Sequence, residues 1–166
     1  EFEIGDYVAA AGAGLANHAE YVNVPKNLVV KCPDGIDMKS ASTVTLGAIS
    51  MHGVRRSELS IGDYCAVFGT GILGLISIQI LSKMGIRVIA VDIDDRRLEI
   101  AQKLGAEVVV NSLKEDPVKR ALFFTNNHGV DSVLFSANVN SGKPLSQAFN
   151  MCRRKGKVVM LGKAKL

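Results

Sequence analysis

Three glycines at the junction of two apolar segments constrain the fold most. Gly69, Gly71 and Gly74 form a G-x-G-x-x-G pattern directly after the apolar run 64–68, and a segment of helical periodicity follows them. Glycine within a regular element costs about 0.5–1 kcal/mol because of its backbone entropy, so a packed domain normally avoids such a cluster. The pattern therefore indicates a tight strand-to-helix turn that another group approaches very closely.

From this first strand onward, short β-branched or apolar runs alternate with helical periodicity. Their near-continuous Val, Ile and Leu content is typical of parallel strands that are buried on both faces. Strand–helix–strand units are right-handed and build an open sheet with helices on both faces. The sequence therefore predicts an α/β fold with a Rossmann-type doubly wound parallel sheet. Its predicted strands are 64–68, 87–91, 107–110, 132–135 and 157–161.

Apolar residues at helical spacing predict which face of each intervening helix packs on the sheet. The predicted stripes are Leu73, Ile76, Ile80 and Met84 on the first helix, Leu98, Ala101 and Leu104 on the second, and Leu145, Ala148, Phe149 and Cys152 on the fourth. The third helix is predicted to begin at Pro117 with Asp116 as its N-cap.

The composition argues against several classes of protein. In 166 residues, 48% are hydrophobic, enough to bury the core of one domain or slightly more. The net charge of +4 is spread along the chain and Trp is absent, which argues against a nucleic-acid surface. No apolar run is long enough to span a membrane, and no signal peptide is evident. Cys32, Cys65 and Cys152 form no C-x-x-C pair, which predicts a cytoplasmic protein with inert, reduced cysteines.

The position of the glycines favours a dinucleotide as the approaching group. In such turns the first glycine permits the tight bend, the second lets the ligand approach the backbone, and the third lets the helix pack on the strand. The free N–H groups and the positive end of the helix dipole suit a pyrophosphate.

An acidic residue at the end of the second strand indicates which dinucleotide. Asp92 lies 18 residues after Gly74, in the stretch VIAVDID. A carboxylate there accepts hydrogen bonds from the ribose hydroxyls of adenosine and would repel a 2′-phosphate. The sequence therefore favours NAD over NADP, although the guanidinium groups of Arg96 and Arg97 argue in the other direction.

Several motifs, in this order, resemble the medium-chain dehydrogenase/reductase family, in its zinc-type alcohol and threonine dehydrogenase branch. They are GDYVAAAG, HAEYVNVPKNLVVKCPDG, GDYCAVFGTGILGL, VIAVDIDDRRLEIAQKLGA, GVDSVLFSA and GKVVMLG. In that family the nucleotide domain is inserted within a GroES-like catalytic domain, and a full subunit is much longer. The resemblance implies that residues 1–44 are the C-terminal part of the first catalytic-domain segment, and that residues 45–166 are an incomplete NAD(P)-binding domain.

The same resemblance implies cofactor contacts beyond Gly69 and Gly74. It places Thr70, Gly71, Ile72 and Leu73 along the pyrophosphate and the back of the nicotinamide. It places Asp92 and Arg97 on the adenosine ribose and Ile93 on the adenine. Ser136 and Ala137, after the fourth strand, and Leu161 and Gly162, at the end of the fifth, would pass near the adenosine and nicotinamide portions.

The resemblance also implies a catalytic zinc ion in the whole protein, held by Cys, His and a third Cys or Glu. Two of these ligands would precede Glu1, and the third falls at Val44 or Thr45, neither of which ligates zinc well. His18 and His52 are the nearest alternatives, and we interpret both as structural residues. We assign no metal ligand, and no catalytic residue either, because no carboxylates show the paired spacing of acid–base chemistry.

Taken together, these patterns predict an NAD-dependent oxidoreductase that acts on a small-molecule alcohol, polyol or sugar-derived substrate, with the nicotinamide supplying the hydride chemistry. Three alternatives stay open. A zinc-independent NADPH-dependent reductase of quinones or enoyl thioesters fits the missing ligand, and a non-catalytic nucleotide-binding module fits the short chain. The third alternative is a methyltransferase, which also has a glycine-rich first turn. It usually carries an acidic residue just before its glycines, whereas residues 65–68 are apolar here, which argues against it. We expect no nucleic-acid or membrane partner, and an open sheet edge would permit a homo-oligomer.

Overall fold

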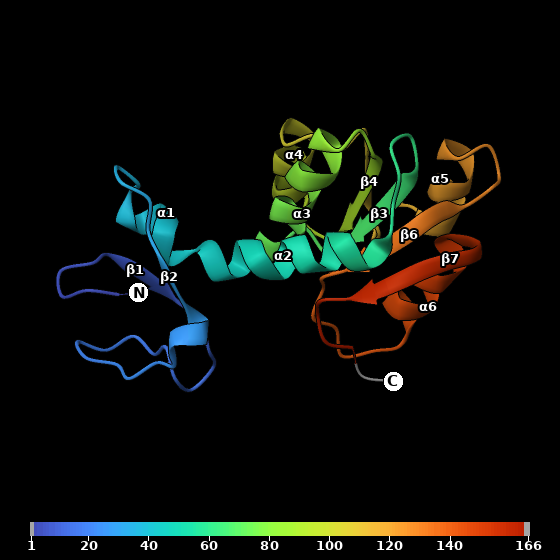
Figure 1. Cartoon of the computed structure of the whole chain (residues 1–166). Coiled ribbons are helices and arrows are strands. Elements are labelled where there is room, and N and C mark those ends of the chain that lie inside the picture. Colours follow the sequence, from blue (N-terminus) through green and yellow to red (C-terminus); the bar gives the residue numbers. More distant parts are fainter. Residues whose placement is uncertain (1, 165–166) are drawn as a thin grey trace. The chain divides into compact units, whose positions relative to one another are not determined.

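The structure, a computed structural model, describes residues 2–164 and divides the chain into two compact units, Glu1–Ala48 and Ile49–Leu166. In the first unit, β1 (Val8–Ala10) pairs antiparallel with β2 (Val29–Lys31), and the 3-10 turn η1 (Lys26–Leu28) and the short helix α1 (Met38–Ser42) complete it (Figure 1). Among residues 2–48 only Ala41 is buried, so this segment builds no apolar core of its own.

The second unit is a doubly wound parallel sheet, as predicted. Its strands lie in the order β5-β4-β3-β6-β7, so the chain winds outward from β3 to β5, crosses over, and winds outward again from β6 to β7. The elements are α2 (Val44–Ser57), which begins in the first unit, β3 (Tyr64–Phe68), α3 (Ile72–Lys83), β4 (Arg87–Asp92), α4 (Asp95–Lys103), β5 (Val108–Asn111), α5 (Pro117–Phe124), β6 (Val130–Phe135), α6 (Lys143–Met151) and β7 (Cys152–Met160).

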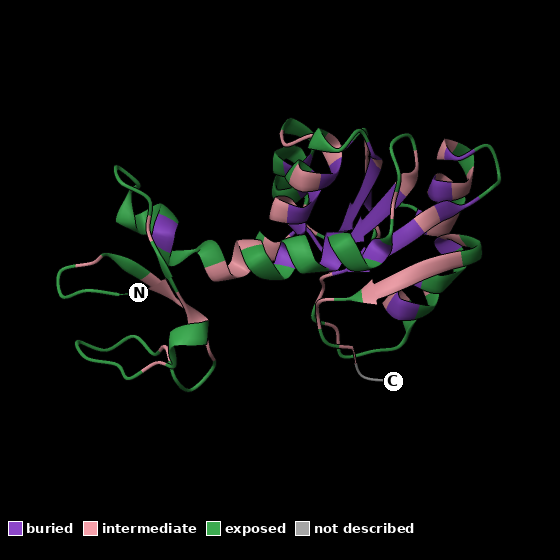
Figure 2. Cartoon of the chain, viewed as in Figure 1, coloured by how far each residue is buried: buried purple, intermediate pink, exposed green. Residues whose placement is uncertain are grey.

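Apolar cores cover both faces of this sheet. Cys65 and Val67 of β3 face one core, which also holds residues of α2, α3 and α4. Ala66 and Phe68 face the other, which holds residues of α5 and α6. The central strands are therefore buried on both sides (Figure 2), as their continuous apolar sequence predicts.

All five predicted strands are present; the first, β3, has the predicted bounds, and the other four differ from the prediction at one or both ends. The fifth differs most, because β7 begins at Cys152 rather than at Lys157. Its register against β6 shifts between Val130, which pairs with Cys152, and Ser132, which pairs with Lys157. The strand therefore contains an irregularity at Arg153–Gly156, a basic stretch that carries no apolar pattern.

The predicted stripe on α3 was only partly correct: Ile80 packs against the core, but the stripe is not the buried face of the helix. Gly74, Ser77, Ile78 and Leu81 are the buried residues of this helix, whereas Met84 is 42% exposed. The sequence of α3 is apolar on almost every side, so periodicity alone does not select a face. The rotation is set instead by Gly74, because a Cβ at this position would lie 2.0 Å from the carbonyl oxygen of Gly69. Only a glycine can face the turn there.

Two residues of the predicted stripe on α6 also lie elsewhere. Leu145 and Ala148 are buried as predicted, but Phe149 is 59% exposed and Cys152 is the first residue of β7. Met151, which is fully buried, takes the last core position of the helix. The buried face Leu145, Ala148 and Met151 follows an i, i+3, i+6 spacing, which is also compatible with one side of a helix, so the pattern was ambiguous. The predicted start of α5 is confirmed, since the Asp116 carboxylate accepts the Val118 N–H at 2.9 Å.

Candidate functional site

The carboxyl ends of four strands open onto one cavity of about 330 Å³ in the second unit. It lies where the winding of the sheet reverses, between β3 and β6, and crevices at such points are the usual ligand sites of open α/β sheets. Its lining residues are Phe68, Gly69, Gly71, Val91, Asp92, Ile93, Arg97, Ser112, Ser136, Ala137, Asn138, Val139 and Pro144.

Packing within the protein explains two of the three glycines. Gly69 has φ +95°, and a Cβ there would lie 2.7 Å from the backbone nitrogen of Ala137. Gly74 faces the Gly69 carbonyl, as described above. Gly71 is different: its φ of −71° suits any residue, and a Cβ there would meet no atom within 4 Å. Because Gly71 lines the cavity, the fold leaves open space beside a backbone that needs no glycine for its own conformation.

Helix α3 begins at this glycine without a side-chain cap. Gly71 is its N-cap residue and provides no side-chain hydrogen bond, whereas the carboxylates of Asp94 and Asp116 cap α4 and α5. The first N–H groups of a helix have no partner within the helix, and they carry the positive end of its dipole. The start of α3 therefore suits an anionic group placed against the exposed backbone at Gly71.

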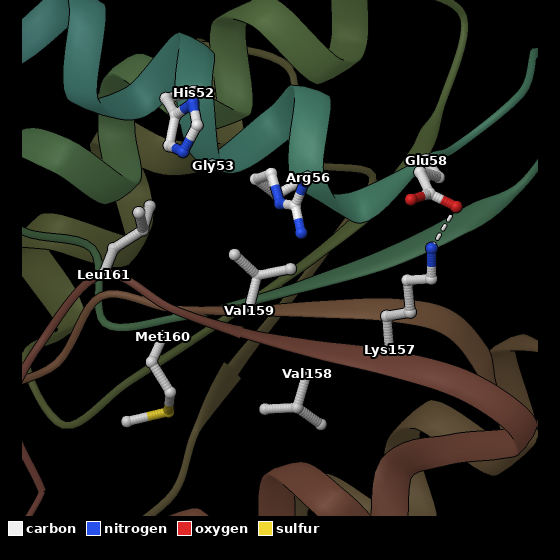
Figure 3. Close-up of a pocket in the computed structure, with 9 residues that line it drawn as sticks. All are labelled: His52, Gly53, Arg56, Glu58, Lys157, Val158, Val159, Met160 and Leu161. Atoms are coloured by element: carbon white, nitrogen blue, oxygen red, sulfur yellow. Dashed lines mark ion pairs between the residues drawn. The ribbon is translucent and has the colours of Figure 1, made fainter.

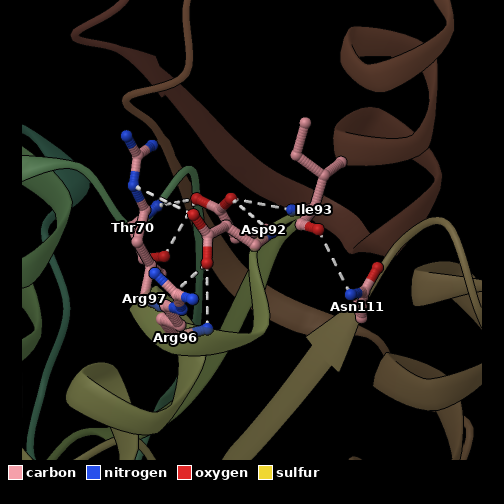
Figure 4. Close-up of polar contacts among 7 residues, drawn as sticks. Thr70, Asp92, Ile93, Arg96, Arg97 and Asn111 are labelled. Atoms are coloured by element: carbon pink, nitrogen blue, oxygen red, sulfur yellow. Dashed lines mark hydrogen bonds and ion pairs between the residues drawn. The ribbon is translucent and has the colours of Figure 1, made fainter.

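Asp92 ties the glycine turn to the end of β4 (Figure 4). Its side chain is buried, and its Oδ2 accepts hydrogen bonds from the Thr70 backbone nitrogen at 2.6 Å and from Thr70 Oγ1 at 2.9 Å. Its Oδ1 accepts from the backbone nitrogens of Ile93 at 2.7 Å and Asp94 at 3.1 Å. These four donors match the roughly four acceptor positions of a carboxylate. Asp92 thus holds the turn in addition to lining the cavity.

An apolar and a basic side chain flank Asp92 at the cavity. Ile93 is 62% exposed, and its carbonyl accepts from the Asn111 side-chain amide at 3.2 Å. Arg97, on the first turns of α4, lies 3.9 Å from the Asp94 carboxylate. Arg96 is not among the lining residues.

A polar network just outside the cavity supports the end of β5. Asp95 accepts from the Asn111 side-chain amide at 2.8 Å and pairs with Lys114 at 2.7 Å. The hydrogen bonds from Lys114 and Asn111 lower the pKa of Asp95. The carboxylate therefore stays charged and fixes the side chain of Asn111, which in turn holds the Ile93 carbonyl.

The structure brings seven of the thirteen predicted contact residues to the cavity. They are Gly69, Gly71, Asp92, Ile93, Arg97, Ser136 and Ala137. Thr70 and Gly74 are buried behind the turn, and Ile72 and Leu73 continue α3 outside the lining. Leu161 packs on Gly53 of α2, where a Cβ would lie 2.7 Å from Leu161 Cδ1.

Gly162 packs against the loop after β6 rather than into the cavity. A Cβ at Gly162 would lie 2.2 Å from the Ala137 carbonyl oxygen. The same loop is held by Asn138, whose side-chain oxygen accepts the Lys163 N–H at 2.9 Å. Gly162 therefore supports the cavity wall that Ala137 forms.

Sequence reasoning missed six residues of the lining, namely Phe68, Val91, Ser112, Asn138, Val139 and Pro144. Most of them end a strand or follow one closely, so the rule that ligands bind at the carboxyl ends of parallel strands would have found them. Pro144 lies at the start of α6, and no signal in the sequence points to it.

A second cavity, of about 400 Å³, lies between α2 and β7 and shares no lining residue with the first (Figure 3). His52 and Arg56 of α2 line it together with residues of β7, and Lys157 forms an ion pair with Glu58 at its rim. The hydrogen bond from Lys157 lowers the pKa of Glu58.

The described residues do not form a metal centre. No three His, Cys, Asp or Glu side chains between positions 2 and 164 come together in a way that would hold a metal ion. His18 is exposed in the first unit and His52 is exposed in the second. Burial raises the pKa of the Cys65 thiol, and it raises that of Cys152 to about 11, so both thiols are protonated at neutral pH.

None of the helices in the described part of the chain has the length and apolar character needed to cross a membrane.

The sheet order and the glycine turn place the chain among the Rossmann-type α/β proteins. The profile of the zinc-binding dehydrogenases matches residues 73–165, which is more than half of the chain. The chain therefore belongs to the zinc-binding dehydrogenase family, which confirms the resemblance to medium-chain dehydrogenases seen in its motifs.

Known proteins similar to this chain are longer. An alcohol dehydrogenase of Geobacillus stearothermophilus is 36% identical over 146 residues, which cover 87% of this chain and 42% of that protein. The crystal structure of 2R,3R-butanediol dehydrogenase from Bacillus subtilis has a TM-score of 0.77 at 31% identity and covers 89% of this chain and 42% of its own. A protein of Sinorhizobium meliloti named as a zinc-binding dehydrogenase, bound to NADP, has a TM-score of 0.77 at 25% identity, covering 86% and 44%. The chain spans about two fifths of the length of these proteins.

Proposed function

We propose that this chain is the NAD-binding part of a dehydrogenase that transfers a hydride between nicotinamide and a small alcohol, polyol or sugar-derived substrate. The observation that carries the proposal is Gly71, a glycine with an ordinary φ that lines the cavity and has open space where a side chain would stand. The protein's own packing gives no reason for a glycine there. A ligand that lies against the backbone gives one.

The residues of the cavity fit the parts of a dinucleotide. The pyrophosphate would lie against the backbone at Gly71 and the start of α3, where the N–H groups and the helix dipole favour negative charge. The adenosine ribose would lie at Asp92, and the exposed side chain of Ile93 offers an apolar surface to the adenine. When bound, the nicotinamide supplies the hydride chemistry, and these residues bind and orient the cofactor.

Asp92 favours NAD over NADP. A 2′-phosphate at the ribose would lie close to a buried carboxylate, and the two negative charges repel each other. The Sinorhizobium meliloti protein, which is similar to this chain, is bound to NADP, so the relative affinity for NADH and NADPH is the quantity to measure.

The remaining parts of the proposal concern the whole protein. We assign residues 1–44 to the C-terminal part of the first segment of a GroES-like catalytic domain and residues 45–166 to the NAD(P)-binding domain of a cytoplasmic enzyme, whose open sheet edge would permit a homo-oligomer. The family and the alcohol dehydrogenases similar to this chain support an alcohol or polyol as substrate. Catalytic residues would come from outside the chain, so we expect residues 1–166 to bind cofactor without turning over an alcohol.

Calorimetric titration of the 166-residue chain with NADH and with NADPH tests the proposal. We expect both to bind and NADH to bind more tightly. Tighter binding of NADPH would refute the cofactor preference and favour the quinone or enoyl reductase alternative. If folded protein gives no heat with either nucleotide, the proposed function is wrong.

A further inference from the structure

One peptide group of the glycine turn is held at both ends by side chains from two other strand ends. The carbonyl oxygen of Gly69 accepts a hydrogen bond from Ser136 Oγ at 2.6 Å. The N–H of the same peptide, on Thr70, donates to Asp92 Oδ2 at 2.6 Å. Ser136 follows β6 and Asp92 ends β4, so the Gly69–Thr70 peptide is fixed between the two strands that flank β3.

The orientation of this peptide matters because its reversal would turn the Gly69 carbonyl oxygen towards the cavity. Reversing this peptide rotates ψ of Gly69 together with φ of Thr70, and the absence of a Cβ on Gly69 leaves its part of that rotation less restricted than in any other residue. In the structure the carbonyl points inward, towards the start of α3, as its closeness to Gly74 shows. A carbonyl turned outward would present its negative end to an anion in the cavity, where the phosphates of a dinucleotide are proposed to lie.

The two hydrogen bonds also strengthen each other. A carbonyl that accepts a hydrogen bond polarises its peptide, which makes the N–H of that peptide a better donor. Here that N–H donates to a buried carboxylate, which is a charge-assisted bond. Loss of the Ser136 hydroxyl would therefore weaken the bond between Thr70 and Asp92 as well as free the Gly69 carbonyl.

We propose that Ser136 is a positioning residue of the nucleotide site, because its hydroxyl and the Asp92 carboxylate together lock the Gly69–Thr70 peptide with its carbonyl turned away from the phosphates. This inference rests on the proposed function, since it concerns the same site. It assigns to Ser136 a task different from direct contact with the cofactor, because its hydroxyl is already used inside the protein.

The chain offers a matched control at Ser132. This serine lies on β6, four residues before Ser136, is fully buried, and also donates from its hydroxyl to a backbone carbonyl, that of Lys157 at 3.0 Å. It lies outside the cavity lining. Ser136→Ala and Ser132→Ala therefore remove the same kind of bond, and only the first touches the glycine turn.

Two measurements on the 166-residue chain test the inference. In NMR spectra without nucleotide, Ser136→Ala is expected to move the Thr70 amide proton upfield, and Ser132→Ala is expected to leave it in place. In NADH titrations, the Kd of Ser136→Ala is expected to rise about tenfold, the effect of losing one well-placed hydrogen bond, while Ser132→Ala binds as wild type. Ser136→Cys keeps a weak donor and should lie between wild type and alanine in both measurements. It takes the place of the alanine variant should that fail to fold.

The outcomes separate this inference from the proposed function. If wild type binds neither NADH nor NADPH, the proposed function fails and the positioning role falls with it. If wild type binds and the Ser136 variants bind equally well, only the positioning role is overturned. An equal rise in Kd for Ser132→Ala would also overturn it, because general loss of stability would then explain the effect.

Discussion

Replacing Gly71 and Gly74 by alanine separates a glycine required by the fold from one that we assign to a ligand. At Gly74 the new Cβ would lie 2.0 Å from the Gly69 carbonyl oxygen and 2.9 Å from Ser136 Oγ, so the turn or the helix must move. Forcing extra volume into a packed site costs about 1–3 kcal/mol or more. At Gly71 the Cβ meets nothing within 4 Å and φ is −71°, so neither overlap nor backbone strain is introduced.

We therefore expect opposite profiles from the two variants. Gly71→Ala should keep the free energy of unfolding within about 1 kcal/mol of wild type, since a compatible glycine-to-alanine change alters mainly the unfolded chain. Gly74→Ala should lose about 1–3 kcal/mol, or roughly 2–12 °C in melting temperature for a domain of this size. In NADH titrations, Gly71→Ala should bind at least about tenfold more weakly, because its methyl group occupies the proposed pyrophosphate position.

Gly142→Ala is the matched control for Gly71→Ala. Gly142 is likewise an N-cap residue without a side-chain cap, a Cβ there also meets nothing within 4 Å, and it does not line the cavity. It should preserve both stability and NADH affinity. Urea unfolding and calorimetry measure the two quantities. The reasoning is refuted if Gly71→Ala unfolds as readily as Gly74→Ala, or if it binds NADH as wild type does.

Two further predictions concern charged side chains. Asp92→Asn replaces an oxygen that accepts hydrogen bonds by an amide nitrogen that faces donors, so we expect the free energy of unfolding in urea to fall by about 1–3 kcal/mol. We also expect a smaller preference for NADH over NADPH. An unchanged free energy of unfolding would show that the four hydrogen bonds are not formed. Lys157 lowers the pKa of Glu58, so Lys157→Met should return that pKa towards its ordinary value of 4.5 in an NMR titration, with Lys155→Met as the control that leaves it lowered. Because the folded pKa lies below the unfolded one, the contribution of this pair to stability is present above about pH 4.5 and is lost as the pH falls through the folded value. An unchanged Glu58 pKa in Lys157→Met would contradict the assignment.

The sequence predicted the sheet well because its strands carry two independent signals. Each buried strand is an unbroken apolar run, and each is bounded by a helix with recognisable ends, such as Asp116 before Pro117. The faces of two helices were less predictable. In α3 almost every position is apolar, and the contact between Gly74 and the Gly69 carbonyl, which sets the rotation, is a tertiary contact. In α6 two different helical spacings each gave an apolar face, and only packing on the sheet distinguishes Met151 from Phe149.

For the site, the sequence predicted which strand ends meet and identified Asp92, but it did not predict the hydrogen bonds that connect these strand ends. Asp92 was identified by its distance from the glycines, and its four hydrogen bonds inside the protein have no signature in the sequence. The same holds for Ser136, whose partner is a backbone carbonyl 67 positions earlier in the chain. Side chains that hold the backbone of a turn become visible only when the strand order brings them together.

On the proposed function, Asp92 and Arg97 would act on the adenosine ribose in opposite directions, and we expect their balance to set the cofactor preference. Asp92 is 8% exposed, so its charge acts on a neighbouring phosphate through a largely protein environment, where the effective dielectric constant is lower than in water. The Arg97 side chain is 57% exposed and has the Asp94 carboxylate beside it, so solvent and a counter-charge weaken its attraction for a 2′-phosphate. We therefore expect repulsion from Asp92 to outweigh attraction to Arg97, which the NADH and NADPH titrations would measure. A ribose hydroxyl, by contrast, would need only to displace the Thr70 hydroxyl from Asp92, while the Thr70 backbone N–H could keep its own bond to that carboxylate.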